Sequence, residues 1–332
     1  MSGIPILITG ATGYIGARLL VELIERLGDG VRCRVAVRKG SDASFLRNLP
    51  VEIVRADLRD PVAVNEAVKG SEVVFHCAGL VAYTKNFRNR LYDTNVLGTR
   101  HVVDACLEAG VKRLVATSSI AAVGSPGAES GTQESNEQST FTEWQRHNVY
   151  MESKHLAELE CHRGVAEGLD VVMVNPGVVI GKSSGRALPG SSSNEVLRMI
   201  YEGRLPLCPE GSTGFVDVLD VADAHIAAWR KGSAGERYII VGENLSFREL
   251  FRRIAAMPGS RAGKVFRVGG AAGMAAGAGG ELWSLVTQRP SFISIESLRQ
   301  AAYPARYSNQ RSVRELGMSY RPFEETLRSA IL

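Results

Sequence analysis

The first half of the chain alternates short apolar runs, rich in β-branched residues, with longer amphipathic stretches, and this alternation limits the fold more than any other feature. The apolar runs read PILIT, VRCRVAVR, VEIVRAD, EVVFHCAG, RLVATSS and LDVVMVNPG, and stretches such as IGARLLVELIERLG and LGTRHVVDACLEAG lie between them. Strands buried on both faces read as continuous apolar runs, and strands that alternate with helices are joined by parallel crossovers. We therefore predict an α/β fold with a doubly wound, parallel sheet that carries helices on both faces.

Charge and hydropathy exclude several partners. The 39 basic and 35 acidic residues are spread along the chain without a block of like charge, so we expect no nucleic-acid partner. The N-terminal MSGIPILITG lacks the basic and long apolar regions of a signal peptide. The segment VGGAAGMAAGAGGELW at 268–283 is too short and too rich in glycine to cross a membrane, so we expect no stable membrane insertion and predict a flexible lid or a loosely packed helix there.

Cysteine usage indicates a reducing compartment. The chain has five widely spaced cysteines and no C-x-x-C arrangement, which argues against a disulfide framework and against a zinc site. His155 and His162 lie seven residues apart, too far along a helix to converge on one metal ion. We therefore expect a cytoplasmic protein without a metal.

A glycine-rich turn joins the first predicted strand to the first predicted helix. In ITGATGYIGARLL, Gly10, Gly13 and Gly16 fall at this junction. Glycine permits a tight turn, lets a pyrophosphate approach backbone N–H groups, and leaves the positive end of the helix dipole open to the anion. The spacing G-x-x-G-x-x-G is one residue longer between its first two glycines than the common dinucleotide fingerprint. An ordinary glycine turn is the alternative, but the position between strand and helix favours dinucleotide binding in a Rossmann-type fold.

The end of the second strand bears on the choice of dinucleotide. The sequence VAVRKGSD places Arg38 about 20 residues beyond the last glycine, where the adenine ribose is expected. An acidic residue there would bond the 2′-hydroxyl of NAD, whereas an arginine accommodates the 2′-phosphate of NADP. Arg38, with Lys39 or Ser41 beside it, favours NADP over NAD; a solvated basic turn is the alternative. Asp57, after the third strand, is expected to bond the adenine amine or to cap the next helix.

The segment VYMESKHLAE places Tyr150 and Lys154 four residues apart, on one face of a predicted helix. A neighbouring ammonium stabilises a phenolate and lowers the pKa of the phenol, which makes tyrosine a usable general acid. One Y-x-x-x-K match is common by chance, and a packed aromatic with a solvated lysine is the alternative. This match, however, follows RLVATSSIAAVG, a strand whose carboxyl end carries Thr117, Ser118 and Ser119, and open parallel sheets bind ligands at that edge.

In this order the motifs resemble the extended short-chain dehydrogenase/reductase family, within the NAD-dependent epimerase/dehydratase superfamily. The resemblance runs from TGATGYIG through DL, VFHCAG, DTNVLGT, TSSIAAVG, YMESK and NPGVVIG to FVDVLDVADAHIAAW. VAVRKG, VFHCAG and GSTGFVDVLDVADAH are most similar to the dihydroflavonol 4-reductase-like and 3β-hydroxysteroid dehydrogenase-like branch. Nucleotide-sugar epimerases usually carry an arginine shortly before the valine-aspartate pair, where this chain reads STGF at 212–215, and this departure weakens the sugar-nucleotide alternative.

The resemblance implies roles for individual residues. Ser119 would bond the substrate carbonyl, Tyr150 would donate the proton, Lys154 would hold the nicotinamide ribose and lower the pKa of the tyrosine, and Asn95 would order the site. Besides Tyr150 and Lys154, the implied cofactor contacts are Gly10, Thr12, Gly13, Tyr14, Ile15, Gly16, Arg38, Lys39, Asp57, Leu58, Cys77, Ala78, Gly79, Thr117, Pro176, Gly177, Val178 and Val179.

These expectations combine into one predicted function. We predict an NADP-dependent oxidoreductase that reduces a ketone or aldehyde, or oxidises the alcohol, by hydride transfer. A nucleotide-sugar epimerase or dehydratase with tightly bound NAD is the alternative, followed by a dinucleotide-sensing protein without activity. Residues 1–175 would form the NADP-binding Rossmann domain with the catalytic Ser, Tyr and Lys, and residues 176–332 mainly a smaller substrate-binding lobe, partly interleaved with it.

The expected partners are a small carbonyl or alcohol substrate and a second copy of the chain, paired through helices near 97–109 and 150–167. Tyr83, Phe87 and Tyr92 either line the substrate cavity or belong to the core. Phe141 and Trp144, in a long polar segment, could cover an apolar or aromatic substrate.

Overall fold

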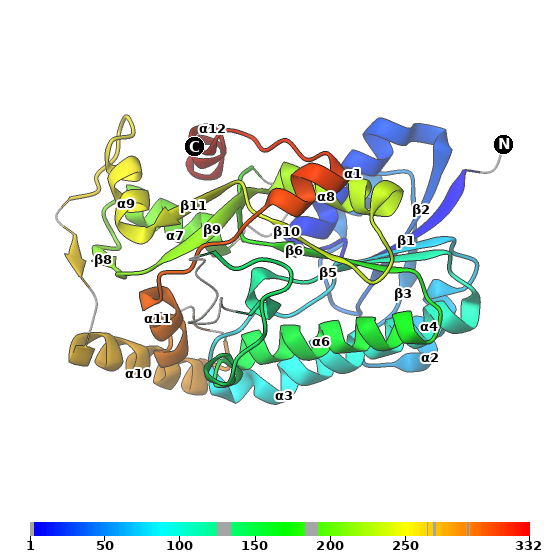
Figure 1. The fold of residues 1–332 in the computed structure, drawn as a ribbon, viewed down its shortest axis with the longest axis horizontal. Helices are drawn as coiled ribbons and strands as arrows, with labels where there is room; N and C mark the ends of the chain where they lie inside the picture. Colours follow the sequence, from blue (N-terminus) through cyan, green and yellow to red (C-terminus); the bar gives the residue numbers. More distant parts are fainter. Residues whose placement is uncertain are drawn as a thin grey trace.

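A seven-stranded parallel sheet forms the centre of the computed structural model (Figure 1), in which the described residues are 3–124, 134–182, 192–263, 265–267, 270–289, 291 and 293–332. The strand order is β10-β6-β5-β4-β1-β2-β3, and every neighbouring pair is parallel. This confirms the predicted doubly wound sheet. The strands are β1 (Ile4–Thr9), β2 (Val31–Val37), β3 (Val51–Arg55), β4 (Val73–His76), β5 (Arg113–Thr117), β6 (Val171–Pro176) and β10 (Arg237–Ile240).

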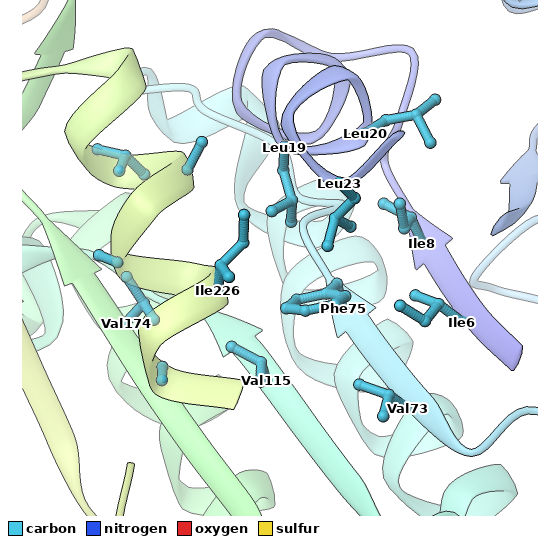
Figure 2. Packing of buried hydrophobic residues seen from close by; sticks show 14 of the residues in the cluster. Ile6, Ile8, Leu19, Leu20, Leu23, Val73, Phe75, Val115, Val174 and Ile226 are labelled. Carbon is cyan, nitrogen blue, oxygen red and sulfur yellow. The ribbon is translucent and has the colours of Figure 1, made fainter. Parts of the chain in front are cut away.

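Helices cover both faces of this sheet, which explains why its strands read as continuous apolar runs (Figure 1). Phe75 of β4 lies on the face that carries α1 and α8, where Leu23 and Ile226 pack over it (Figure 2). Val74, one residue earlier, lies in the cluster on the opposite face, with α2, α4 and α6. The bounds are α1 (Tyr14–Leu27), α8 (Val218–Lys231), α2 (Pro61–Val68), α4 (Gly98–Ala109) and α6 (Val149–Ala166).

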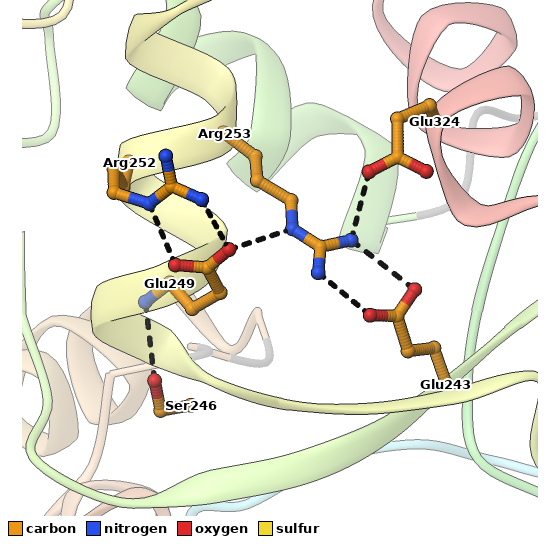
Figure 3. A network of polar contacts seen from close by, with 6 residues as sticks. All are labelled: Glu243, Ser246, Glu249, Arg252, Arg253 and Glu324. Carbon is orange, nitrogen blue, oxygen red and sulfur yellow. Dashed lines mark hydrogen bonds and ion pairs between the residues drawn. The ribbon is translucent and has the colours of Figure 1, made fainter.

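A second, smaller lobe surrounds a mixed sheet in the order β11-β9-β7, and β8 pairs with β12 beside it. Phe215, Leu250 and Phe323 belong to its core, and Arg253 joins Glu243 to Glu324 across it at 2.7 and 2.9 Å (Figure 3). Its elements are β7 (Val178–Ile180), β8 (Leu207–Cys208), β9 (Ser212–Asp217), β11 (Glu243–Ser246), β12 (Phe266–Arg267), α7 (Ser192–Tyr201), α9 (Phe247–Ala255), α10 (Gly270–Thr287), α11 (Ile295–Ala302) and α12 (Phe323–Ile331).

Two elements that follow residue 176, α8 and β10, return to the large sheet. Helix α8 begins at Val218, where Asp217 caps it by accepting from the backbone N of Leu219 at 2.7 Å. The remaining short elements are α3 (Arg88–Leu91), α5 (Glu143–Arg146), the 3₁₀ turns η1 (Gly28–Gly30), η2 (Ser44–Asn48), η3 (Lys85–Phe87) and η5 (Ile120–Ala122), and the π-helical turns η4 (Tyr92–Leu97) and η6 (Ser312–Leu316).

Candidate active site

The carboxyl ends of the central strands meet at the point where the strand order reverses. Strand β1 pairs with β2 on one side and with β4 on the other, so the connections after β1 and β4 diverge there. Gly10 follows β1, Ala78 follows β4 and Ser119 follows β5, which places all three at one edge of the sheet. Ligands of open α/β sheets bind at such an edge.

Glycines shape the turn after β1. Gly10 has φ +74°, and a Cβ there would lie 2.5 Å from the backbone N of Ala78. At Gly16 a Cβ would lie 2.4 Å from the carbonyl oxygen of Gly10. Gly13, the N-cap residue of α1, has no side chain to bond the first N–H groups of the helix. The turn is therefore a cradle that larger side chains would fill, and it fits the pyrophosphate of a dinucleotide.

Tyr14 joins this turn to the second lobe. Its hydroxyl donates to the carbonyl oxygen of Gly181 at 2.6 Å. Asn194 bonds the same glycine twice: its Oδ1 accepts from the backbone N of Gly181, and its Nδ2 donates to the carbonyl oxygen of Gly181. Burial raises the pKa of Tyr14 above its ordinary value. The side chain that we expected to contact the cofactor thus also fixes the segment that follows β7.

A basic depression of about 510 Å³ lies at the ends of β2 and β3. Asp57 is bound there by Arg59 through Nε and Nη2 at 3.0 and 2.7 Å, and this hydrogen bonding lowers the pKa of Asp57 to about 2. The expectation that Asp57 caps the next helix is wrong, because Asp60 accepts from the first N–H groups of α2. The lining residues are Arg38, Lys39, Gly40, Arg55, Ala56, Asp57, Arg59, Asp60 and Ala63.

A buried chain of hydrogen bonds connects β1, β4 and α4 behind this edge. The Thr99 hydroxyl donates to the carbonyl oxygen of Asn95 at 2.6 Å, so it accepts from Nε2 of His76 at 3.1 Å. Nδ1 of His76 then accepts from the Thr9 hydroxyl at 2.8 Å, and Thr9 accepts from the backbone N of Ala78 at 3.3 Å. Burial lowers the pKa of His76 to about 3, which keeps the ring neutral.

Asn95, in the π-helical turn η4, holds the loop after β4 against α6. Its Oδ1 accepts from the backbone N of Leu80 at 2.7 Å, and its Nδ2 donates to the carbonyl oxygen of Leu80 and to Ser153 Oγ, both at 3.0 Å. A Cβ at Gly79 would lie 3.4 Å from both Asn95 Oδ1 and Lys154 Nζ. Asn95 therefore fixes the loop after β4 next to the side chain of Lys154.

Tyr150 and Lys154 both lie on the first turns of α6, which Asn148 caps through the N–H groups of Tyr150 and Met151. Lys154 is 9% exposed and donates to the carbonyl oxygen of Thr117 at 3.0 Å. Tyr150 is 8% exposed; burial raises its pKa, and a hydrogen bond with Ser119 opposes that rise. The pKa of Tyr150 is therefore raised overall, whereas a lysine neighbour was expected to lower it, because removing the phenolate from water has the larger effect.

A carboxylate one helical turn beyond Lys154 connects the site to β6 and β10. Glu158 is buried, accepts from Nδ2 of Asn175 at 2.5 Å, and pairs with Arg237 at 2.9 Å. The same Nδ2 donates to the carbonyl oxygen of Ser119 at 3.0 Å. Burial lowers the pKa of Lys154, and the charge of Glu158 opposes this shift.

Behind β5, His225 of α8 fixes Thr117. Its Nδ1 donates to the carbonyl oxygen of Val221 at 2.7 Å, so Nε2 accepts from the Thr117 hydroxyl at 2.7 Å. Burial lowers the pKa of His225 to about 4. His76, Glu158 and His225 were not predicted as part of the site, although all three lie within or beside the motifs of the family resemblance.

Aromatic residues surround Tyr150. Tyr83 packs edge-on against it with ring centroids 5.4 Å apart, and Phe87 is buried in the same cluster. Tyr92 is largely exposed, so it belongs neither to the core nor to this cluster. Phe141 stacks on His155 at 4.2 Å. The side chain of Trp144 lies outside the described residues.

The other residues that we expected at the cofactor lie at the same edge of the sheet. Thr12 and Ile15 flank the uncapped start of α1, and Leu58 follows Asp57. Cys77 continues β4 by donating its N–H to the carbonyl oxygen of Thr9 at 3.1 Å. Pro176 ends β6, and Gly177 lies against β9, since a Cβ there would be 2.5 Å from the carbonyl oxygen of Gly214. Val178 and Val179 follow in β7, where both are partly exposed.

Neither a membrane span nor a metal cluster is found within the described ranges. No helix there is long and apolar enough to cross a bilayer. No group of three or more His, Cys, Asp and Glu side chains there could hold a metal ion.

The fold and this site define an NAD(P)-dependent enzyme of the extended short-chain dehydrogenase/reductase type. The chain belongs to the NAD dependent epimerase/dehydratase family, whose model matches residues 6–241. It is 29% identical to a Synechocystis sp. protein provisionally named dihydroflavonol 4-reductase, over 98% of this chain and 92% of that one. It is 28% identical to cinnamoyl-CoA reductase 1 of Oryza sativa subsp. japonica, over 98% and 88%. The solved structure of gox2253 superimposes with a TM-score of 0.82 at 30% identity, covering 98% and 96%.

Proposed function

We propose that the protein is an NADP-dependent carbonyl reductase that acts on a fairly apolar ketone or aldehyde and can oxidise the corresponding alcohol. The observation that carries the choice of NADP is the basic depression, where Arg38, Lys39, Arg55 and Arg59 surround the place expected for the 2′-phosphate. Relatives named as reductases support a reductase over an epimerase. The partly buried Tyr83 and Phe141, which pack in the same cluster as Tyr150, support an apolar substrate.

The residues present fit a dinucleotide, and each has a proposed task. The glycine cradle and the uncapped start of α1 would bind the pyrophosphate. Lys154 would bind the nicotinamide ribose, and the nicotinamide would rest against residues Pro176 to Val179. The bound dinucleotide supplies hydride chemistry. Ser119 would hold the substrate oxygen while Tyr150 transfers its phenolic proton to that oxygen. Because burial keeps Tyr150 protonated at neutral pH, the phenol is ready to donate.

Arg38→Ala tests the choice of cofactor. We expect the Kd for NADPH to rise roughly 10- to 100-fold, because a charge-assisted hydrogen bond contributes about 1.5–3 kcal/mol, while the Kd for NADH changes little. The measurement is a titration of wild type and variant with both nucleotides, followed by nicotinamide fluorescence. Arg100→Ala, an exposed arginine of α4 that does not line the depression, is the control.

The same titration addresses the alternative function. A nucleotide-sugar epimerase or dehydratase retains and recycles its cofactor, so the purified protein would carry NAD that does not exchange. That result, or equal weakening of both nucleotides by Arg38→Ala, would contradict the reductase proposal, and nucleotide sugars would then be the substrates to assay.

Two aspects of organisation belong to this proposal. We retain the division at residue 175 between the dinucleotide domain and the substrate lobe, with α8 and β10 as the interleaved parts. We also retain a homodimer through α4 and α6, which pack side by side on one face of the sheet (Figure 1).

A further inference from the structure

Helix α10 packs on the protein through its small residues. Gly273, Gly277 and Ser284 are buried along one side of the helix. A Cβ at Gly277 would lie 2.7 Å from the backbone N of Ile295, and one at Gly280 would lie 1.8 Å from the carbonyl oxygen of Ile293. The glycine side of α10 is therefore pressed against the segment that leads into α11.

Hydrogen bonds fix the rotation of α10 about its axis. Ser284 is fully buried and donates to Oδ1 of Asn86 at 3.3 Å, so it accepts from the Thr84 hydroxyl at 3.0 Å. Ser294, just before α11, donates to the carbonyl oxygen of Tyr83 at 3.0 Å. The side opposite Ser284 consequently faces outward.

That outward side is apolar. Leu282 (63% exposed) and Val286 (76%) lie opposite Ser284 at helical spacing, and Trp283 (47%), Leu285 and Met274 are exposed on its two flanks. Between residues 273 and 287 the one charged residue is Glu281, which is only partly exposed and whose Oε1 accepts from the backbone N of Ile295 at 3.4 Å. A surface helix normally turns its polar side to water, and α10 does the reverse.

Cations border this apolar side at both ends of the helix. Arg267 precedes α10 and Arg289 follows it, and both are exposed, as are the neighbouring apolar side chains of Phe266 and Ile293. Trp and Leu side chains bury favourably at the boundary between lipid headgroups and acyl chains, and nearby arginines attract anionic headgroups. A protein interface, in contrast, usually surrounds its apolar centre with a polar rim, and α10 offers few polar groups on this side.

We propose that the outward side of α10, formed by Met274, Leu282, Trp283, Leu285 and Val286, is a docking surface for a membrane that contains anionic lipids. The helix lies along the lipid surface and does not cross it, in keeping with the lack of a membrane-spanning helix among the described residues. Arg267 and Arg289 contact the headgroups while the apolar side chains enter the boundary region.

Vesicle flotation of the full-length protein tests this proposal. Wild type is expected to float with vesicles of phosphatidylcholine and phosphatidylglycerol, and more weakly with phosphatidylcholine alone. Leu282→Ser/Val286→Ser should reduce binding at least roughly tenfold, and Arg267→Gln/Arg289→Gln should remove most of its dependence on salt and on anionic lipid. Val62→Ser/Val313→Ser, at exposed apolar positions of α2 and η6, is the matched control and should float like wild type.

A second readout follows Trp283 directly. Binding to vesicles should shift tryptophan emission to shorter wavelength, and Trp283→Phe should lose most of this shift while retaining flotation. Wild type that does not float with anionic vesicles, or an unchanged affinity in both double variants, would overturn the proposal. Sedimentation without lipid tests the other occupant: a dimer that Leu282→Ser/Val286→Ser dissociates would show that a second copy covers α10, which would also overturn it.

Discussion

Replacing Tyr150 with phenylalanine is expected to lower kcat for carbonyl reduction by roughly 100- to 10,000-fold, because general acid catalysis by one positioned side chain contributes that much. The Kd for NADPH should stay close to the wild-type value, since the ring that packs against Tyr83 remains. The measurement is steady-state kinetics with a carbonyl substrate, together with the fluorescence titration of the nucleotide.

Tyr83→Phe is the matched control for this variant. Tyr83 is a neighbouring tyrosine whose pKa is also raised by burial, so the two variants remove the same group from the same aromatic cluster. Only the loss of the Tyr150 hydroxyl should lower kcat by this factor. Equal activity in Tyr150→Phe and wild type would show that Tyr150 is not the proton donor.

The pH dependence of the reduction follows from the same burial. Because the pKa of Tyr150 is raised, the phenol remains protonated through neutral pH, and the loss of its proton at higher pH should slow reduction. Oxidation of the alcohol needs the phenolate and should accelerate over the same rise. The two directions, measured on one enzyme preparation, should therefore respond to alkaline pH with opposite signs.

The sheet and the glycine turn could be predicted because they depend on local sequence. Strands that are buried on both faces produce continuous apolar runs. At Gly10 and Gly16 a side chain would collide with the backbone, so both positions require glycine. Of the two roles expected for Asp57, the helix cap fails for a local reason: Asp60, three residues later, lies at the N-cap position, while Arg59 bonds both oxygens of Asp57.

The buried polar network could not be predicted in the same way. His76 bonds to Thr9 and Thr99, which lie 67 and 23 residues away, and no spacing rule links partners at such separations. The raised pKa of Tyr150 also depends on burial, which is a property of the folded chain. The exposed apolar side of α10 exists because its glycine side packs against the segment before α11, and the sequence does not reveal that contact. The sequence therefore left a lid and a loosely packed helix as alternatives.

Glu158→Gln is expected to move the alkaline limit of activity to lower pH. Glu158 is the carboxylate that opposes the effect of burial on Lys154, and Arg237 lies on its far side. Removing its charge leaves two cations near each other, so the pKa of Lys154 should fall further and the lysine should lose its proton earlier as the pH rises. The measurement is the pH profile of kcat/KM, in which a purely structural loss would lower the activity without moving the limit.

The same substitution should lower the free energy of unfolding by about 3 kcal/mol, because it leaves the partly buried guanidinium of Arg237 without the carboxylate of Glu158. Denaturant unfolding of the variant measures this change.

The double variant Glu158→Gln/Arg237→Met separates charge from structure. It removes one of the two cations, so the alkaline limit should return toward the wild-type pH and part of the stability should be recovered. Glu158→Asp, which keeps the charge on a shorter side chain, should preserve the limit even where it loses stability. An alkaline limit that is unchanged in Glu158→Gln would mean that Glu158 acts only through its bonds to Arg237 and to Asn175, which in turn donates to the carbonyl oxygen of Ser119.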